Sequence, residues 1–204
     1  MQNLFRRWGK KFLSRTASHY PIRSASGRVL LSPLQKDEIR FIESWFQDRE
    51  TCELAFGVKA PWDVLSTIRE EYIEELQKDK VGVLSVYLEK GNKISQPIGF
   101  VRYKLFEKGR RRQARVGIIL GPPRHRGRGI GKEAFQTLLD YLFEQRNVKQ
   151  IELDTATFNL QAQACFRACG FEPVREMEFT SINTQWTEKR LVMRLSKQQW
   201  EAAR

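Results

Sequence analysis

A loop rich in glycine and arginine joins a predicted strand to a predicted helix, and it restricts the fold more than any other feature of the chain. The loop consists of Arg126, Gly127, Arg128, Gly129, Ile130 and Gly131. Three glycines within five positions let the backbone turn sharply and approach a ligand closely. The free N–H groups of the helical turn that follows, aided by the helix dipole, favour a bound anion. The sequence therefore indicates an α/β fold with an anion site where a strand meets a helix.

Two common phosphate-binding motifs do not fit this loop. A Walker loop ends in Gly-Lys-Ser/Thr, whereas Gly131 and Lys132 are followed here by Glu133. A Rossmann fingerprint follows the first strand as G-x-G-x-x-G, whereas these glycines lie late in the chain and at another spacing. We expect Arg124, Arg126 and Arg128 to add positive charge to the site. Taken alone, the loop also fits a solvated connection between two elements.

The hydrophobic pattern predicts alternating strands and helices in one domain. Strands are expected at 29–31, 81–88, 97–106, 114–120, 150–155, 173–182 and 186–195, with a turn at Asn183 and Thr184. Helices are expected at 37–47, 61–77, 131–145 and 159–168. This order indicates a mixed sheet with helices on its faces. The length of 204 residues suits a single α/β domain.

The first 26 residues differ from the rest of the chain. They are rich in Arg, Lys and Ser, and apolar residues recur among them at helical spacing. We expect residues 1–26 to form a basic amphipathic appendage and residues 27–204 to form the folded domain. A solvated tail, an anchor for an anionic surface and a transit peptide all remain open for the appendage.

Composition excludes several classes of protein. No apolar run approaches the roughly 18 residues of a membrane-spanning helix. Three cysteines and two histidines form neither a disulfide framework nor a zinc-site spacing, so no bound metal is expected. We expect Cys165 and Cys169 to be small core residues. A reducing, cytoplasmic setting follows, with organellar targeting by the appendage as the alternative.

The net charge of +12 is unevenly distributed. Residues 1–28 carry +7 and residues 102–128 carry +9, whereas residues 37–80 carry −6. Such asymmetry points to partners of both signs. We expect the appendage and the turn at 108–112 to serve a polyanion such as RNA or the ribosome. The acidic segment would face a cationic partner, or it would form an ordinary solvated helix face.

A second motif follows 28 residues after Gly131. Asn159, Ala162, Phe166, Gly170 and Phe171 form N-x-x-A-x-x-x-F-x-x-x-G-F. Together the two motifs resemble the GNAT superfamily of N-acetyltransferases, whose pyrophosphate loop reads Q/R-x-x-G-x-G/A. The resemblance covers residues 114–172, and by element order it extends from 28 to 195. Within the superfamily the chain looks most like the Rim-type ribosomal-protein alanine acetyltransferases and some aminoglycoside acetyltransferases.

The resemblance implies a mixed, mainly antiparallel sheet with splayed central strands and helices on both faces. It implies that acetyl-CoA is the acyl donor and that the domain over 27–204 is an N-acetyltransferase. The arm of the cofactor would lie along the strand that precedes the loop, where a backbone amide at Leu120 polarises the thioester carbonyl. The cofactor-binding residues implied are Ile118, Ile119, Leu120, Arg124, Arg126, Gly127, Arg128, Gly129, Ile130, Gly131, Asn159 and Phe166.

The expected reaction involves an acid for the departing thiolate and a base for the attacking amine. The family usually has Tyr at the place of Phe166, where it protonates the departing thiolate, and Phe has no such proton. Since a thiol has a reference pKa of about 8.5, coenzyme A still leaves tolerably as the anion. Asp154 is our candidate for the base that deprotonates the amine, with Glu152 and Glu107 as alternatives. His125 would contact a phosphate or solvent.

These observations predict direct transfer of an acetyl group from acetyl-CoA to a primary amine, either a protein N-terminus or a small amine. No covalent acetyl-enzyme is expected. The alternative is a non-catalytic module that binds acyl-CoA or associates with RNA on the same fold. The sequence does not identify the acceptor or the oligomeric state.

Overall fold

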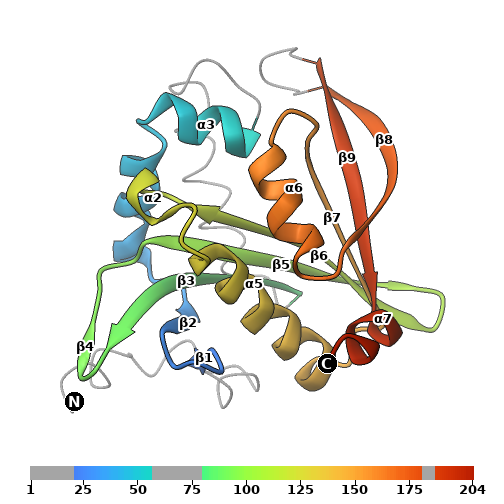
Figure 1. Ribbon diagram of the computed structural model, residues 1–204, viewed down its shortest axis with the longest axis horizontal. Coiled ribbons are helices and arrows are strands. Elements are labelled where there is room, and N and C mark those ends of the chain that lie inside the picture. Colours follow the sequence, from blue (N-terminus) through green and yellow to red (C-terminus); the bar gives the residue numbers. More distant parts are fainter. Residues whose placement is uncertain (1–20, 57–79, 181–186) are drawn as a thin grey trace.

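The computed structural model describes residues 21–56, 80–180 and 187–204 (Figure 1). The strands are β1 (Ile22–Arg23), β2 (Val29–Pro33), β3 (Val81–Lys90), β4 (Lys93–Ile94), β5 (Gly99–Lys108), β6 (Arg111–Leu120), β7 (Gln150–Ala156), β8 (Glu172–Thr180) and β9 (Thr187–Ser196). The helices are α2 (Ile39–Trp45), α3 (Arg49–Phe56), α5 (Ile130–Asp140), α6 (Leu160–Arg167) and α7 (Lys197–Ala202). Shorter segments are the 3-10 turns η2 (Lys36–Glu38) and η3 (Pro123–His125) and the π-helical segment η4 (Tyr141–Gln145).

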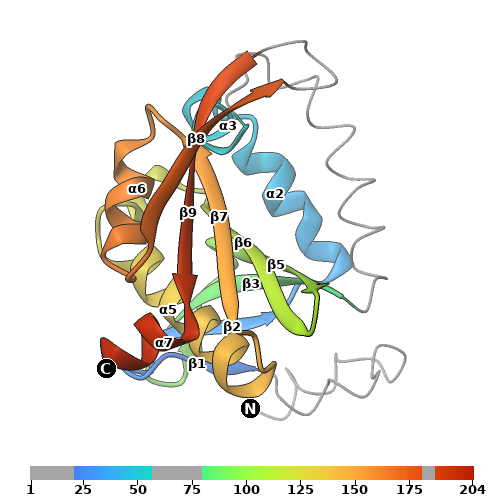
Figure 2. The same cartoon turned by 90° about the vertical axis from the view of Figure 1, so that its right-hand side faces the viewer.

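The described strands form one sheet in the order β1-β2-β3-β5-β6-β7-β9-β8, with β4 paired to β3 at the edge. Neighbouring strands are antiparallel except for β6 and β7, which are parallel. Helices cover both faces: α5 and α6 lie on one side of the sheet and α2 on the other (Figure 2). The predicted mixed, mainly antiparallel sheet with helices on both faces is therefore confirmed.

Two hydrophobic clusters hold the helices on the sheet. The larger one lies under α5 and contains Phe135 and Leu138 of that helix together with Leu153 of β7 and Met193 of β9. The smaller one lies under α2, where Trp45 packs near the end of β6. A Cβ atom on Gly121 would lie 2.1 Å from the Trp45 ring, so only glycine fits at this position. Within the described residues, no helix is both long and apolar enough to cross a membrane.

The central strands β6 and β7 separate before β6 reaches the loop. β6 and β7 are paired only over Gln113–Arg115 and Gln150–Glu152. Beyond that point β6 stays on β5 as far as Leu120, whereas β7 stays on β9 as far as Ala156. The edge of β6 that faces β7 is thus without a ladder partner in the described chain. This is the splay that the family resemblance implies.

The structure differs from the prediction at the first helix. We expected one helix over 37–47, but the chain forms η2 and α2 and then starts α3, which was not predicted. The break has a local cause: the Asp48 carboxylate accepts hydrogen bonds from the Thr51 N–H at 2.9 Å and the Thr51 hydroxyl at 2.6 Å. A carboxylate in this position caps a new helix. The predicted helix over 61–77 and the turn at 183–184 lie outside the described residues.

The sheet begins earlier than the expected domain boundary at residue 27. Ile22 and Arg23 of β1 pair with Leu31 and Leu30 of β2. Ser24 is buried, and its hydroxyl donates to the Glu133 carboxylate at 2.7 Å. Residues 22–26, which we expected in the appendage, therefore belong to the folded body. The division into an appendage and an acetyltransferase domain stays a prediction, since residues 1–20 lie outside the described part of the chain.

Candidate active site

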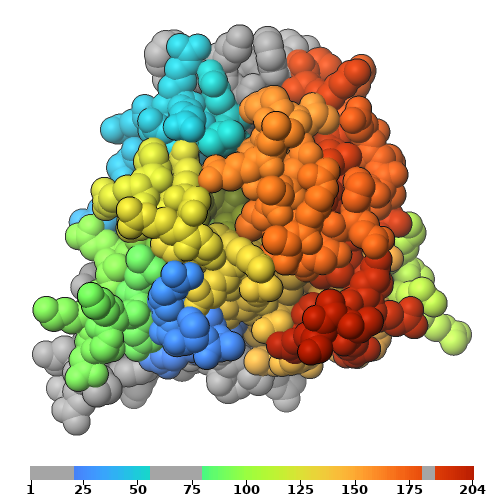
Figure 3. Space-filling model, viewed as in Figure 1, coloured from blue at the N-terminus to red at the C-terminus, as the bar shows by residue number. Residues whose placement is uncertain are grey.

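A cavity of about 310 Å³ lies where β6 and β7 separate. Figure 3 shows the recess between the loop that precedes α5, in yellow, and α6, in orange. α3 closes one end of it. The lining residues are Thr51, Leu54, Ala55, Ile118, Ile119, Leu120, Arg126, Gly127, Gly129, Gly131, Lys132, Asn159, Gln161, Ala162, Cys165 and Phe166.

The glycine loop has the backbone conformation of an anion site. Gly127 and Gly129 have φ angles of 70° and 74°, which other L-residues rarely adopt. Gly129 is the N-cap of α5, so the N–H groups of the first helical turn have no carbonyl four residues earlier to accept them. Ile130 is buried in the core, and only its backbone is available to a ligand. Lys132, which is not among the predicted cofactor-binding residues, adds a cation to the lining.

Arg126 lines the cavity, but its guanidinium is held by the protein. It donates to the carbonyls of Leu120 at 3.2 Å and Gly121 at 3.0 Å, and to the Thr51 hydroxyl at 2.5 Å. Its side chain is only 13% exposed, with Glu50 at 3.6 Å. Its buried Nη1 has no hydrogen-bond partner in the described chain, so a role of Arg126 toward an anion stays a prediction. Arg126 also ties the loop to the end of β6 and to α3.

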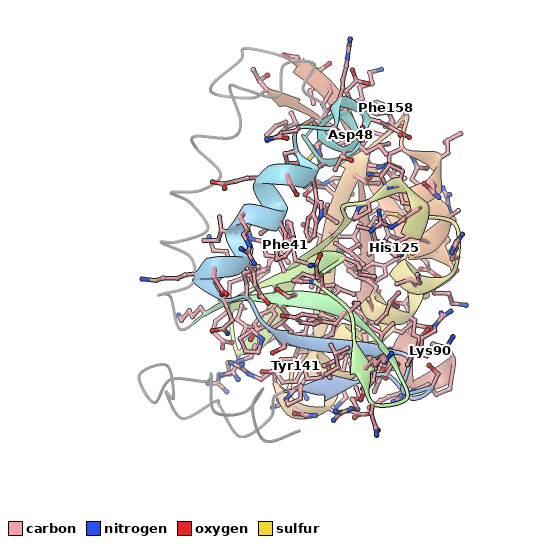
Figure 4. The ribbon with its side chains drawn as sticks, turned by 90° about the vertical axis from the view of Figure 1, so that its left-hand side faces the viewer. Phe41, Asp48, Lys90, His125, Tyr141 and Phe158 are labelled. Carbon is pink, nitrogen blue, oxygen red and sulfur yellow. The ribbon has the colours of Figure 1, made fainter. Side chains whose placement is uncertain are left out.

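The other charged groups of the loop lie outside the cavity lining. Arg124 and Arg128 are exposed at its surface. Burial, followed by the charges of these two arginines, lowers the pKa of His125, so its imidazole is neutral at pH 7. Figure 4 shows His125 in the loop that precedes α5. Any contribution of Arg124 and Arg128 to anion binding would act over a distance, through charge alone.

The end of β6 supplies an open backbone edge. Ile118, Ile119 and Leu120 line the cavity and remain paired with β5 on one side only. Ile118 and Leu120 pack on the cluster under α5, whereas Ile119 packs on the cluster under α2. An extended ligand chain can hydrogen-bond to such an edge as an added strand does.

α6 begins at Asn159, whose side chain both accepts and donates a hydrogen bond. The Asn159 side-chain oxygen accepts from the Ala162 N–H at 3.1 Å, which caps the helix. Its amide nitrogen donates to the Leu54 carbonyl at 3.2 Å, which joins α6 to α3 across one end of the cavity. In Figure 4, Asp48 and the exposed Phe158 lie at this same end of the molecule. The Asn159 side chain thus shapes the cavity through α3 as well as lining it.

Phe166 and Cys165 present different chemistry to the cavity. Phe166 is 5% exposed and packs on Phe135 with the ring centroids 5.1 Å apart, so no proton donor stands at this position. Cys165 is only partly buried and lines the cavity, whereas Cys169 is buried in the core. Our expectation of a core residue is therefore wrong for Cys165. A hydrogen bond from the Cys169 thiol lowers the pKa of Cys165.

The three carboxylates that we considered as bases are all paired with arginine. Asp154 lies on β7, and its carboxylate is 2.6 Å from the Nε of Arg190 on β9. Asp154 does not line the cavity. Glu152 pairs with Arg115 and Arg194, each at 3.2 Å, and Glu107 pairs with Arg112 at 3.1 Å. Asp154 lies on the strand that borders the splay, whereas Glu107 lies at the far end of β5.

Comparisons with known proteins agree with this geometry. A family model described as acetyltransferase (GNAT) domain matches residues 28–172. The curated spermidine N(1)-acetyltransferase of Vibrio cholerae serotype O1 is 23% identical over 159 residues, which span 72% of this chain and 80% of that protein.

Solved structures share the fold. The crystal structure of spermidine N-acetyltransferase from Vibrio cholerae in complex with CoA and spermine has a TM-score of 0.69 at 21% identity, covering 85% of this chain and 98% of that one. An aminoglycoside acetyltransferase in complex with coenzyme A has a TM-score of 0.66 at 19% identity, covering 85% of this chain and 98% of that one. At these identities the likeness establishes the common fold.

Proposed function

The chain belongs to the acetyltransferase (GNAT) domain family, and on that premise we propose that its cavity holds acetyl-CoA while a small cationic amine reaches the thioester from the opposite face of the sheet. The protein is an acyltransferase that uses acetyl-CoA as its acyl donor. One observation carries the proposed site. The unpaired edge of β6 and the helix N-terminus at Gly129 line the same cavity, so an extended arm and a pyrophosphate fit it together.

The residues then take the following roles. The N–H groups between Gly127 and Lys132 bind the pyrophosphate, and the Lys132 ammonium adds positive charge. The edge of β6 from Ile118 to Leu120 pairs with the arm of the donor. A backbone N–H at Leu120 polarises the thioester carbonyl, because a fixed dipole stabilises the negative charge that develops there.

The transfer needs no covalent enzyme intermediate. The amine nitrogen attacks the thioester carbon, a C–N bond forms, the C–S bond breaks, and coenzyme A departs as the thiolate. Asp154 remains our candidate to accept the proton of the amine, with Arg190 as its partner in the absence of an acceptor. Because Phe166 has no proton to give, the thiolate takes its proton from solvent. Incubation with acetyl-CoA alone should therefore leave the intact mass unchanged, and an acetyl adduct on Cys165 would contradict this step.

The relatives support a small amine as the acceptor. Their names describe acetylation of spermidine and of aminoglycosides, and both substrates carry several amines. A release assay for coenzyme A with polyamines, aminoglycosides, peptides with free N-termini and aminoacyl-RNA tests this choice. We expect turnover with the first two classes. Binding of acetyl-CoA without release in any class would favour the alternative of a non-catalytic acyl-CoA-binding module.

A polyanion surface is the second function that we propose, and an exposed hairpin supports it. β5 and β6 bring Lys104 opposite Arg115 and Lys108 opposite Arg111, and all four side chains are exposed. RNA or the ribosome would supply phosphates to such a surface. A cytoplasmic location fits this partner and stays a prediction.

Salt dependence tests the polyanion surface. If phosphates are neutralised, the logarithm of affinity for single-stranded RNA should fall against log salt by about 0.7 per contacted phosphate. We expect the basic appendage to bind the same polyanion as the hairpin, so deletion of residues 2–20, which spares β1, should flatten this slope and leave acetylation of a free amine intact. An unchanged slope would show that the appendage does not bind RNA.

A further inference from the structure

Glu188 of β9 is a buried carboxylate with an unused oxygen. Its side chain is only 5% exposed. Oε1 accepts a hydrogen bond from the Nη1 of Arg190 at 2.7 Å, whereas Oε2 has no hydrogen-bond partner in the described chain. Burial raises the pKa of Glu188, although the charge of Arg190 acts in the opposite direction. A buried carboxylate oxygen without a donor is unfavourable, so this atom is suited to receive one from a ligand.

Glu188 shares its arginine with a second acid. The Arg190 guanidinium contacts Glu188 and also lies 2.6 Å from Asp154, and it stacks over the Phe179 ring at 5.3 Å. Two carboxylates therefore surround a single guanidinium that is itself 13% exposed. When both acids are ionised, the cluster carries a net charge of −1. Because the Glu188 carboxylate is buried, this net negative charge favours a further cation beside it.

The strand register places the cluster at the acceptor side of the sheet. Leu153 and Met193 lie opposite each other, and both belong to the core under α5. Side chains alternate along a strand, so Asp154, Glu188 and Arg190 project from the other face. β7 borders the splay, and the proposed cofactor cavity opens on the α5 side. The cluster therefore flanks the gap on the face from which an amine would approach.

We infer that Glu188, held in place by Arg190, forms a subsite for a protonated amine, so that the acceptor is a diamine or polyamine. One amine is acetylated in the splay while a second, as an ammonium group, donates a hydrogen bond to the free Oε2 of Glu188. An ammonium group offers three donors and one positive charge, which match the missing partner and the net charge of the cluster. This inference rests on the proposed function and specifies its substrate.

Paired acceptors of equal length test the subsite. We expect wild-type protein to show a KM for 1,4-diaminobutane about tenfold or more below that for butylamine, the size expected of one charge-assisted hydrogen bond. Glu188→Gln should abolish this preference, measured as the ratio of the two KM values, and leave the Kd of acetyl-CoA nearly unchanged. Glu178→Gln is the matched control, because it removes the same charge from an exposed position on β8 and should retain the preference.

A second measurement needs no variant. A bis-tertiary diamine carries two ammonium groups but cannot be acetylated, and it should inhibit wild-type protein at a concentration about tenfold below that of the matched tertiary monoamine. Equal KM values and equal inhibition would overturn the subsite while acetylation of butylamine upholds the proposed function. Absence of coenzyme A release with every amine would instead overturn the proposed function itself. A preference that Glu188→Gln retains would also overturn the subsite.

Discussion

The Nη2 of Arg126 donates a 2.5 Å hydrogen bond to the Oγ1 of Thr51, and this contact joins the loop before α5 to the first turn of α3. The two residues are 75 positions apart in the chain. The Thr51 hydroxyl in turn donates to Asp48, which caps α3. Arg126, which with Gly129 and Gly131 matches the Q/R-x-x-G-x-G/A motif, thus acts as a link between two walls of the cavity.

This link predicts a stability effect. Arg126→Ala removes hydrogen bonds to the Leu120 and Gly121 carbonyls, and we expect the free energy of unfolding to fall by about 2–4 kcal/mol. Arg128→Ala is the control, because that side chain is exposed and should change stability by less than about 0.5 kcal/mol. Urea unfolding of both variants measures the difference. Equal losses would show that Arg126 does not anchor the loop.

A second prediction concerns the anion site. Gly129→Glu places an anion beside the helix N-terminus, and we expect the Kd of acetyl-CoA to rise by at least about 100-fold. Gly109→Glu is matched, because Gly109 also has a positive φ, 62°, and no atom within 4 Å of its added Cβ, but it lies in the β5–β6 turn. Both variants carry similar backbone strain. Calorimetry that finds the same affinity in both would place the pyrophosphate elsewhere.

The assignment of the base predicts a selective loss of turnover. Asp154→Asn should lower kcat by about 100-fold or more, in the range expected for a lost general base, and leave the Kd of acetyl-CoA nearly unchanged. Asp140→Asn removes an acid from α5 whose partner is Arg204, and it should retain activity. Initial rates across pH distinguish the two. Equal activity of Asp154→Asn and wild type at all pH values would remove Asp154 from the mechanism.

The position of Phe166 predicts that a tyrosine in its place raises kcat. Phe166→Tyr introduces a hydroxyl on a ring that lines the cavity, and a proton donor near the departing thiolate should raise kcat by about tenfold. Near-ultraviolet circular dichroism and thermal unfolding serve as the check on folding. A folded variant with an unchanged or lower kcat would show that departure of the thiolate does not limit the rate.

Glu133 predicts a dependence of stability on pH. Although burial raises its pKa, hydrogen bonds from Ser26, Ser24 and Arg28 outweigh this effect and hold the pKa below the ordinary value of 4.5. The carboxylate therefore stabilises the fold above pH 4.5, and this contribution is lost as pH falls through the folded-state pKa.

The matching variant is Glu133→Gln. We expect it to lower the free energy of unfolding by about 1–3 kcal/mol at pH 7, with the difference shrinking as pH falls below 4.5. Glu144→Gln, an exposed acid paired with Arg204, should show a difference of at most about 1 kcal/mol at every pH. Urea unfolding of both variants and wild type, at a series of pH values from 7 to below 4.5, measures these differences. A pH-independent difference would exclude the charge of Glu133 as the cause.

Short-range features were predictable because their causes lie within a few residues. Gly129 precedes a helix and supplies the left-handed conformation, and Asn159 caps α6 through Ala162. α3 escaped prediction although its signal is local as well: Asp48 caps it through Thr51, but the preceding helical pattern runs directly into it. A cap inside a continuous apolar pattern is easily read as part of one helix.

Most of the strands and helices, the anion loop and the family motifs were predictable from the sequence, since these depend on periodicity and on the conformational freedom of glycine. The partners of the charged side chains depend on the tertiary structure. Arg126 donates a hydrogen bond to Thr51, and Glu133 accepts one from Ser24. Arg190 contacts both Asp154 and Glu188. Each of these contacts depends on strand register and on the packing of distant segments. A local pattern contains neither, because burial and charge pairing are properties of the assembled fold.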